Sequence, residues 1–290
     1  MHSDHIEKKL GSVFAIAIGL FILEIVGGVV SNSLALIADS FHILLDVIAI
    51  GISLIAFRIA KRPHSSTLTF GFHRVEIIAA FINGISLVAM AAFIFYEAYR
   101  RFLVPPEIRT ETLLIVASIG LCVNIIMALM LKKESRSNLN VKGSYIHVLG
   151  DLLSSVGVIV GAILIFFLNN SIIDTIVSIG IGLLIIRSGL ILCKECLHVF
   201  MEGTPKEIEI SEVSGELEKF DEITEVHDVH VWTLTSNIFA MSAHIKVRQE
   251  FIQNPNALLK KINQIMKEQF GINHCTIQIE GEYDLIHPDK

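Results

Sequence analysis

Long runs of apolar residues alternate with short polar links from the N-terminus to about residue 200. A helix that crosses a membrane needs about 20 consecutive apolar residues, and six runs of about that length occur. The pattern therefore predicts an α-helical membrane protein with six transmembrane helices. The expected spans cover about 11–31, 34–58, 74–100, 111–131, 143–168 and 172–194.

Two of the links between these spans are only three residues long. Ser31-Asn32-Ser33 joins the first two spans, and Asn169-Asn170-Ser171 joins the fifth and sixth. Links this short are typical of helical hairpins, whose two helices are antiparallel neighbours. We therefore expect two such hairpins in the bundle.

The pattern changes abruptly beyond about Glu202, where the residues become mostly polar and the apolar positions periodic. We expect a helix over 205–220, opened by Thr204-Pro205, strands over 225–234 and 238–247, a helix over 255–270 and a strand over 275–280. This α-β-β-α-β order is typical of a small ferredoxin-like α+β domain. We place the domain boundary after residue 203, so that 1–203 form the transmembrane domain and 204–290 the α+β domain.

The basic residues of the links predict how the chain is oriented in the membrane. Lys and Arg concentrate in cytoplasmic loops, and with the N-terminus inside the asymmetry is clear. It favours both termini in the cytoplasm, in agreement with an even number of spans. The inside segments hold Lys8, Lys9, Arg58, Lys61, Arg62, Arg74, Lys132, Lys133, Arg136 and Lys142, whereas the outside segments hold Arg100, Arg101 and Arg109.

Composition supports a membrane protein and gives no reason to expect nucleic acid as a partner. Of 290 residues, 52% are hydrophobic and 18% are charged, against roughly 25% charged in a soluble domain. The net charge is -6, and the sequence has no basic stripe with interleaved aromatic residues. The first apolar run is too long for a cleaved signal sequence, so we interpret the N-terminus as mature chain.

Two five-residue motifs of the form H-x-x-x-D, called the two phrases below, hold the candidate metal ligands. His42 and Asp46 lie four residues apart in the second span, and His147 and Asp151 lie four residues apart in the fifth. Residues four apart share one face of a helix, and ionisable side chains inside a membrane are costly and mostly functional. Together the phrases offer four N/O ligands, enough for a tetrahedral Zn²⁺ site, with Cd²⁺, Co²⁺, Fe²⁺ and Mn²⁺ as alternatives. The alternative interpretation is two unrelated polar pairs, each hydrogen-bonded locally.

The depth of the two phrases tests whether they can meet. With six spans the second and fifth helices are antiparallel, and an i,i+4 pair can face its partner in either direction. Counting residues from the outer ends of the spans gives an offset of about 7 Å between Asp46 and Asp151, and comparing phrase midpoints gives roughly 13 Å. Helix tilt and a shift of the span ends by several residues can absorb the smaller offset, whereas the larger one requires a fifth helix that leaves the membrane early.

Other polar residues inside the spans have simpler interpretations. Asp39 shares the face of His42 and either guides the ion's exit or makes a cap or an interhelical hydrogen bond. Glu24, Asn83 and Asn124 are expected to make packing hydrogen bonds. Glu24, the one ionisable residue of these three, is also a candidate lining of a cavity.

Cys193 and Cys196 form a C-x-x-C motif within an apolar helical run. No second pair completes a four-thiolate site, so we interpret them as small buried side chains at a helix end. The four cysteines of the chain are too few and too scattered for a disulfide framework.

Three segments carry a family resemblance that covers the whole chain. Residues 33–46 (SLALIADSFHILLD), 69–84 (TFGFHRVEIIAAFING) and 147–151 (HVLGD) resemble the cation diffusion facilitators, especially their zinc-transporting branch. The resemblance implies that His42, Asp46, His147 and Asp151 form the transport site. It also implies that metal leaves in exchange for protons, that the protein is a homodimer, and that the His/Asp pair of the second span suits zinc.

The resemblance also implies further metal positions outside the membrane. In the cytoplasmic domain it points to His227, His244 and the end of the last strand, where Gln278 and Glu280 stand in place of a His and an Asp of some relatives. The alternative is a set of surface histidines on a dimerisation domain. A third candidate site uses His64 and His73 of the loop between the second and third spans. The acidic ligand often found in this loop is absent between Arg62 and Phe72.

We therefore expect a multi-pass protein of the cell (inner) membrane that exports a divalent metal ion, foremost Zn²⁺, in exchange for protons by alternating access. Zn²⁺ would be the transported substrate and also a regulatory ligand of the cytoplasmic domain. An enzyme is not expected, because the sequence has no H-E-x-x-H or G-x-S-x-G motif. The alternative function is a membrane-anchored metal sensor that does not transport.

Overall fold

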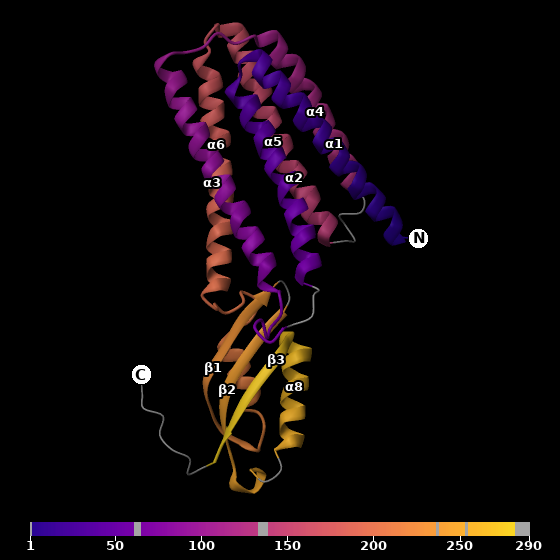
Figure 1. Ribbon diagram of the computed structural model, residues 1–290, viewed down its shortest axis with the longest axis vertical. Coiled ribbons are helices and arrows are strands. Elements are labelled where there is room, and N and C mark those ends of the chain that lie inside the picture. The colour runs from indigo at the N-terminus through magenta and orange to yellow at the C-terminus, as the bar shows by residue number, and fades with distance from the viewer. Residues whose placement is uncertain (1, 61–64, 133–138, 236–237, 253–254, 282–290) are drawn as a thin grey trace. The chain divides into compact units, whose positions relative to one another are not determined.

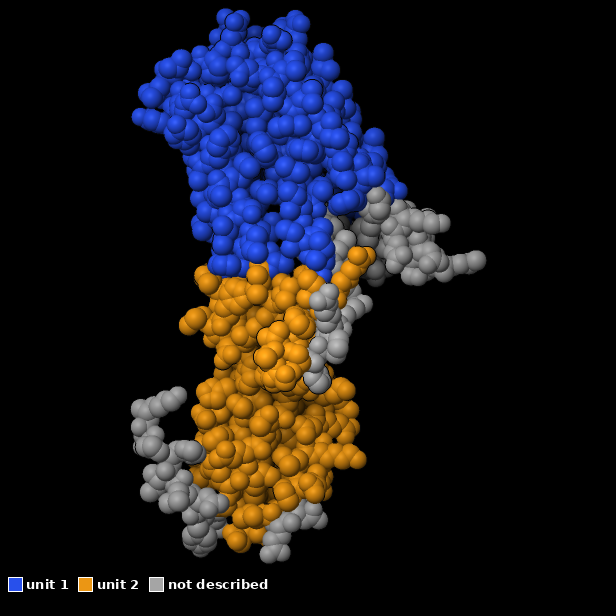
Figure 2. Space-filling view, in the orientation of Figure 1, with its two compact units in different colours: residues 1–55, 79–193 blue, residues 56–78, 194–290 orange. Residues whose placement is uncertain are grey.

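The computed structural model describes residues 2–60, 65–132, 139–235, 238–252 and 255–281. These residues divide into two compact units, coloured separately in Figure 2. The first comprises residues 1–55 and 79–193, and the second comprises residues 56–78 and 194–290. The first unit therefore holds both polar phrases, and the second holds the C-terminal sheet with the adjoining ends of three helices.

Six long helices precede the sheet, as the apolar runs predicted (Figure 1). Among the described residues, five segments are long and apolar enough to cross a membrane: Ser12–Ser31, Arg74–Leu103, Thr110–Lys132, Val148–Leu168 and Ile172–Phe200. The remaining helix, α2, has 27 residues, which is also enough for the ~30 Å hydrocarbon core. The helices are α1 (His2–Ser31), α2 (Leu34–Ala60), α3 (Arg74–Leu103), α4 (Thr110–Lys132), α5 (Leu139–Leu168) and α6 (Ile172–Phe200).

Both short links turn the chain as expected. Asn32 has φ 61° and Asn169 has φ 48°, the left-handed conformation that asparagine tolerates better than most residues and that ends helices. Ser33 then caps α2, because its Oγ accepts a hydrogen bond from Leu36 N at 3.2 Å. The α1–α2 and α5–α6 links are therefore tight turns.

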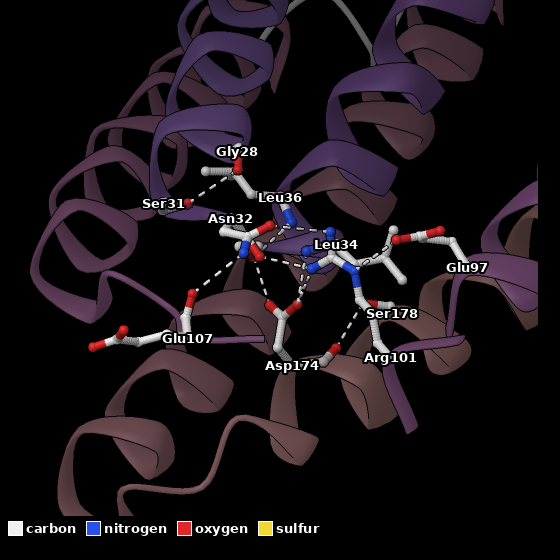
Figure 3. Close-up of polar contacts among 11 residues, drawn as sticks. Gly28, Ser31, Asn32, Leu34, Leu36, Glu97, Arg101, Glu107, Asp174 and Ser178 are labelled. Atoms are coloured by element: carbon white, nitrogen blue, oxygen red, sulfur yellow. Dashed lines mark hydrogen bonds and ion pairs between the residues drawn. The ribbon is translucent and has the colours of Figure 1, made fainter. Parts of the chain in front are cut away.

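A polar network ties the α1–α2 turn to the ends of α3 and α6 (Figure 3). Asp174, in the first turn of α6, accepts hydrogen bonds from Ser33 Oγ at 2.5 Å and from Leu34 N at 2.7 Å. Arg101, near the end of α3, donates to Asn32 O at 2.6 Å and lies 3.9 Å from Asp174 Oδ2. One buried carboxylate thus satisfies backbone and side-chain donors of the α2 N-terminus.

The transmembrane helices bury one face and leave the other apolar and exposed. The main core cluster draws small and branched residues from α2 to α6, including Ala38, Ala91 and Ala162. Large apolar side chains such as Leu153 (69% exposed) and Phe167 (77% exposed) point outward, as expected where lipid replaces water. Glycine brings helices close: a Cβ at Gly84 of α3 would lie 2.7 Å from Cys193 Sγ of α6.

The C-terminal residues form the predicted α-β-β-α-β order with one three-stranded sheet (Figure 1). β1 pairs with β2 antiparallel, and β2 pairs with β3 in parallel. Both helices share a single core with the sheet, built around Val213, Ile245, Ile262 and Met266. The elements are α7 (Ile210–Leu217), β1 (Ile223–Thr235), β2 (Ile238–Val247), a short 3-10 turn η2 (Gln249–Phe251), α8 (Asn256–Phe270) and β3 (Ile272–Glu280).

Two predicted boundaries in this region were wrong. The helix expected from residue 205 begins at Ile210, because Pro205 and Ile208 close a separate turn through a 3.1 Å hydrogen bond. The last strand begins at Ile272 and not at 275. Gly271, with φ 67°, caps α8 and allows the chain to enter the strand at once.

Candidate metal centres

α2 and α5 run antiparallel, and their contacts define a register. Ser154 Oγ donates to Asp39 Oδ1 at 2.7 Å, and His42 Nε2 lies 3.8 Å from Asp151 Oδ1. Moving from Asp39 to His42 along α2 therefore corresponds to moving back from Ser154 to Asp151 along α5. Four residues further in the same directions, Asp46 of α2 lies opposite position 147 of α5, so the two phrases lie side by side.

The predicted depth mismatch between the phrases was therefore wrong. The expected offset relied on counting residues from loop ends. Helix ends do not mark a common depth, because a helix can tilt or extend beyond the apolar layer. α5, for example, begins at Leu139, ahead of the apolar run expected from residue 143. Packing between α2 and α5 sets the register instead.

Three of the four predicted transport ligands come together. His42 Nε2 lies 3.7 Å from Asp46 Oδ2 and 3.8 Å from Asp151 Oδ1. With Zn²⁺ bonds of about 2.0–2.1 Å, the edges of a tetrahedral N/O site are roughly 3.3 Å long. The observed separations thus match a divalent site after small side-chain movements. The side chains of His42, Asp46 and Asp151 are 22%, 26% and 13% exposed, so an ion can reach them.

The fourth predicted ligand, His147, lies on α5, and its side chain is outside the described part of the structure. Asp39 has a clear interhelical partner in Ser154, which favours the hydrogen-bonding interpretation of that residue.

A tighter cluster lies on the sheet of the second unit. His227, His244 and Glu280 each place one ligand atom within 4.8 Å of the others. Glu280 Oε2 lies 3.2 Å from His227 Nε2, and its Oε1 lies 2.9 Å from His244 Nδ1. These residues come from three strands: His227 and His244 are cross-strand partners, and Glu280 pairs with Lys246, two positions beyond His244 on β2. The arrangement offers two imidazoles and a carboxylate to a metal ion.

Sequence reasoning missed Asp228, which adjoins this cluster. β1 is irregular between His227 and His230, and Asp228 has φ 50° there. The resulting bulge turns Asp228 toward the cluster, with its Oδ2 3.7 Å from His244 Nε2. The residue pattern gave no signal for this contact, because on a regular strand Asp228 and its neighbour His227 face opposite sides of the sheet.

Two neighbours of the cluster have other roles. Gln278 Nε2 donates to Glu280 Oε1 at 3.1 Å and so positions the carboxylate. Burial raises the pKa of the Cys275 thiol to about 11. Because the thiolate is the metal-binding form, Cys275 is a poor ligand at neutral pH.

The described part of the structure does not bring His64 and His73, the two candidate ligands of the loop, together. His64 lies outside the described part of the chain. His73 is half-buried in the turn before α3. Nearby, Phe70 contacts the exposed His274 ring edge to face, with centroids 5.9 Å apart.

Comparison with known protein families accounts for nearly the whole chain. The model of the cation efflux transmembrane domain matches residues 12–201, and the model of the cation efflux cytoplasmic domain matches residues 205–282. The two matched regions cover the six helices and the sheet.

Curated relatives match over almost their full length. The cadmium, cobalt and zinc/H(+)-K(+) antiporter of Bacillus velezensis is 40% identical over 283 residues, covering 96% of this chain and 90% of that protein. The metal cation efflux system protein CzcD of Cupriavidus metallidurans is 39% identical over 279 residues, covering 96% and 88%. The zinc transporter ZitB of Escherichia coli is 36% identical over 279 residues, covering 96% and 88%. This chain therefore belongs to the cation efflux family, the cation diffusion facilitators.

Proposed function

We propose that the protein exports Zn²⁺ across the cell membrane in exchange for protons, by alternating access. The observation that carries this proposal is the antiparallel register of α2 and α5, which gathers His42, Asp46 and Asp151 inside the transmembrane unit. The names of the relatives, which include zinc transporters and a metal/proton antiporter, support the same ion class and exchange.

The transport site consists of His42, Asp46, His147 and Asp151. Two carboxylates neutralise a divalent ion, and two neutral imidazoles complete a tetrahedral shell without adding charge. The ligands bind metal only when deprotonated, so protons arriving from outside compete for the same lone pairs and displace the ion. Histidine suits this exchange because its charge changes near neutral pH.

We also propose that His227, His244 and Glu280 bind a regulatory metal ion, with Asp228 beside them. The donor set fits zinc, and the strands hold the three ligand atoms close together. Residues 204–290 then act as a cytoplasmic metal-sensing and dimerisation domain, and residues 1–203 form the transmembrane domain. The protein works as a homodimer in the cell membrane, with both termini in the cytoplasm.

The deciding experiment measures radioactive zinc uptake into proteoliposomes that are acidic inside. Asp46→Asn and Asp151→Asn should each lower uptake at least about 100-fold, because losing a direct ligand costs more than losing a residue that only orients one. Glu111→Gln is the matched control, since Glu111 is an exposed carboxylate at the start of α4. Excess Cd²⁺ and Co²⁺ should compete with the label.

Metal binding without flux would contradict transport and favour the sensor function. To separate the two sites, His227→Ala should remove one class of zinc binding in calorimetry while leaving uptake at saturating zinc. His274→Ala, an exposed histidine of the same sheet, is the control and should bind like the unaltered protein. Loss of flux in Asp46→Asn together with retained binding at His227 would establish two independent sites.

A further inference from the structure

We propose that Glu24 of α1 is a proton-binding site of the transport cycle, separate from the metal ligands. This inference rests on the proposed exchange of metal for protons and assigns one of the protons to a specific side chain. The evidence is the burial of Glu24, the space that α4 leaves for it, its lack of hydrogen-bond donors and the charges that surround it.

Glu24 is built into the transmembrane unit and does not reach solvent or lipid. Its side chain is 1% exposed, and it packs at the contact between α1 and α4. A Cβ atom at Gly120 of α4 would lie only 2.6 Å from Glu24 Oε1. Glycine at position 120 therefore makes the space that the carboxyl group occupies.

This carboxyl group lacks the donors that an ionised carboxylate needs. Glu24 Oε2 is buried without a hydrogen-bond partner among the described residues, and so is Asn124 Oδ1. Asn124 lies one turn from Gly120 on the same face of α4, and its Nδ2 already donates a hydrogen bond to Ser155 Oγ at 2.8 Å. Burying a charged group without partners costs far more than burying a neutral one. A proton on Glu24 removes the charge and supplies a donor to a region that has unpaired acceptors.

The surrounding charges couple this proton to the metal. Among the described residues, the charged groups that act on Glu24 are Asp39 of α2 and Asp151 of α5, and α4 contributes the uncharged Gly120 and Asn124. With the transport site empty, two negative neighbours oppose ionisation of Glu24. A divalent ion bound at Asp151 reverses the local field, so that Glu24 releases its proton as the metal binds.

One short segment of α5 contacts the transport site, Asp39 and Asn124. Asp151 faces His42 in the transport site, Ser154 donates to Asp39, and Ser155 accepts from Asn124. A shift of α5 on metal binding therefore changes the environment of Glu24 as well. Proton release at Glu24 and metal capture at the transport site are thus linked through residues 151–155.

The first test compares two kinds of zinc flux in proteoliposomes. Glu24→Gln keeps the size of the side chain and cannot exchange a proton. It should retain zinc-for-zinc exchange within about twofold but lose most of the accumulation driven by a pH gradient, because only net transport requires the proton. Glu24→Asp should retain both, and Gly120→Ala should lose accumulation like Glu24→Gln because it displaces the carboxyl group. Glu111→Gln is the control.

The second test does not depend on flux. Zinc binding to the purified full-length protein in detergent, measured in buffers of different ionisation enthalpy, should release about one proton fewer per zinc ion in Glu24→Gln than in the unaltered protein. This difference would support the site even if the protein does not transport, in which case only the proposed function fails.

Three results would overturn the proposal. One is pH-driven accumulation and proton release in Glu24→Gln equal to those of the unaltered protein. Another is loss of zinc-for-zinc exchange in a monodisperse Glu24→Gln protein, which would make Glu24 part of the metal site. A third is a dependence of transport on K⁺ that Glu24→Gln abolishes while its response to the pH gradient stays intact, which would identify Glu24 as a K⁺ ligand.

Discussion

Two buried carboxyl groups of the transmembrane unit have opposite surroundings. Asp174 is 2% exposed and Glu24 is 1% exposed. Asp174 accepts hydrogen bonds from Ser33 and Leu34 and lies near Arg101 (Figure 3). Glu24 Oε2 has no hydrogen-bond partner among the described residues, and Gly120 provides the space around Oε1.

The difference teaches what each carboxyl group is suited for. Donors on both oxygens stabilise the ionised form of Asp174 and fix the geometry of the α1–α2 turn. Such a group holds the fold and gains nothing from a change of protonation. A carboxyl group without donors is instead free to bind and release a cation, because no hydrogen-bond network must break when its charge changes. The comparison predicts that stability depends on Asp174 and transport coupling on Glu24.

Asp174→Ala should give the largest loss of stability. The substitution leaves Leu34 N, Ser33 Oγ and Arg101 without their buried acceptor, and removing one partner of a buried charged pair costs about 3–5 kcal/mol. Thermal unfolding in detergent, followed by size-exclusion chromatography, measures the effect. Glu24→Gln is the matched control and should unfold at the temperature of the unaltered protein or above it. Equal losses in the two variants would contradict the comparison.

Ser33→Ala should have a smaller effect of the same kind. It removes one donor to Asp174 and the Oγ cap of Leu36 N, and loss of a helix N-cap costs about 1 kcal/mol. The same unfolding measurement should place this variant between Asp174→Ala and the unaltered protein. Ser33→Thr keeps the hydroxyl group and should recover most of the loss. A Ser33→Ala protein as unstable as Asp174→Ala would mean that the network acts only as a whole.

Local patterns in the sequence predicted the helices and the turns. Apolar runs of sufficient length determined the spans, and Asn32 and Asn169 ended helices through their own backbone conformation. Depth within the membrane could not be obtained this way, because it depends on how α2 packs against α5. The same limit explains why the two phrases, identified correctly as neighbours of one another, were expected at different depths.

Contacts between residues distant in sequence were harder to predict. Asp174 of α6 was not predicted to accept from Ser33, 141 residues earlier in the chain. Glu24 was expected to make a packing hydrogen bond, but its Oε2 has no partner among the described residues. Asp228 escaped prediction because a bulge in β1 reverses the direction of its side chain. In each case the sequence shows the type of residue, but it does not show the tertiary contact that determines the role of that residue.

An exposed carboxylate tests whether burial or the number of partners determines how much a carboxylate contributes to stability. Glu225 of β1 forms a 2.6 Å ion pair with Lys246 of β2, comparable in length to the bonds of Asp174. The hydrogen bond from Lys246 lowers the pKa of Glu225, and the same bond raises the pKa of Lys246. The pair therefore stabilises the sheet above the ordinary pKa of a glutamate, and that contribution disappears as pH falls through the lowered pKa of Glu225.

Glu225→Gln should accordingly have the smallest effect of all, because exposed ion pairs contribute little and are screened by salt. Trp232, the single tryptophan of the chain, lies in the same strand, so its fluorescence reports unfolding of this sheet in the full-length protein. Melting temperatures of Glu225→Gln and the unaltered protein should agree at neutral pH in high salt. A small difference at low salt should vanish as the pH is lowered through the titration of Glu225. A loss as large as that of Asp174→Ala would show that partners alone, without burial, determine what a carboxylate contributes.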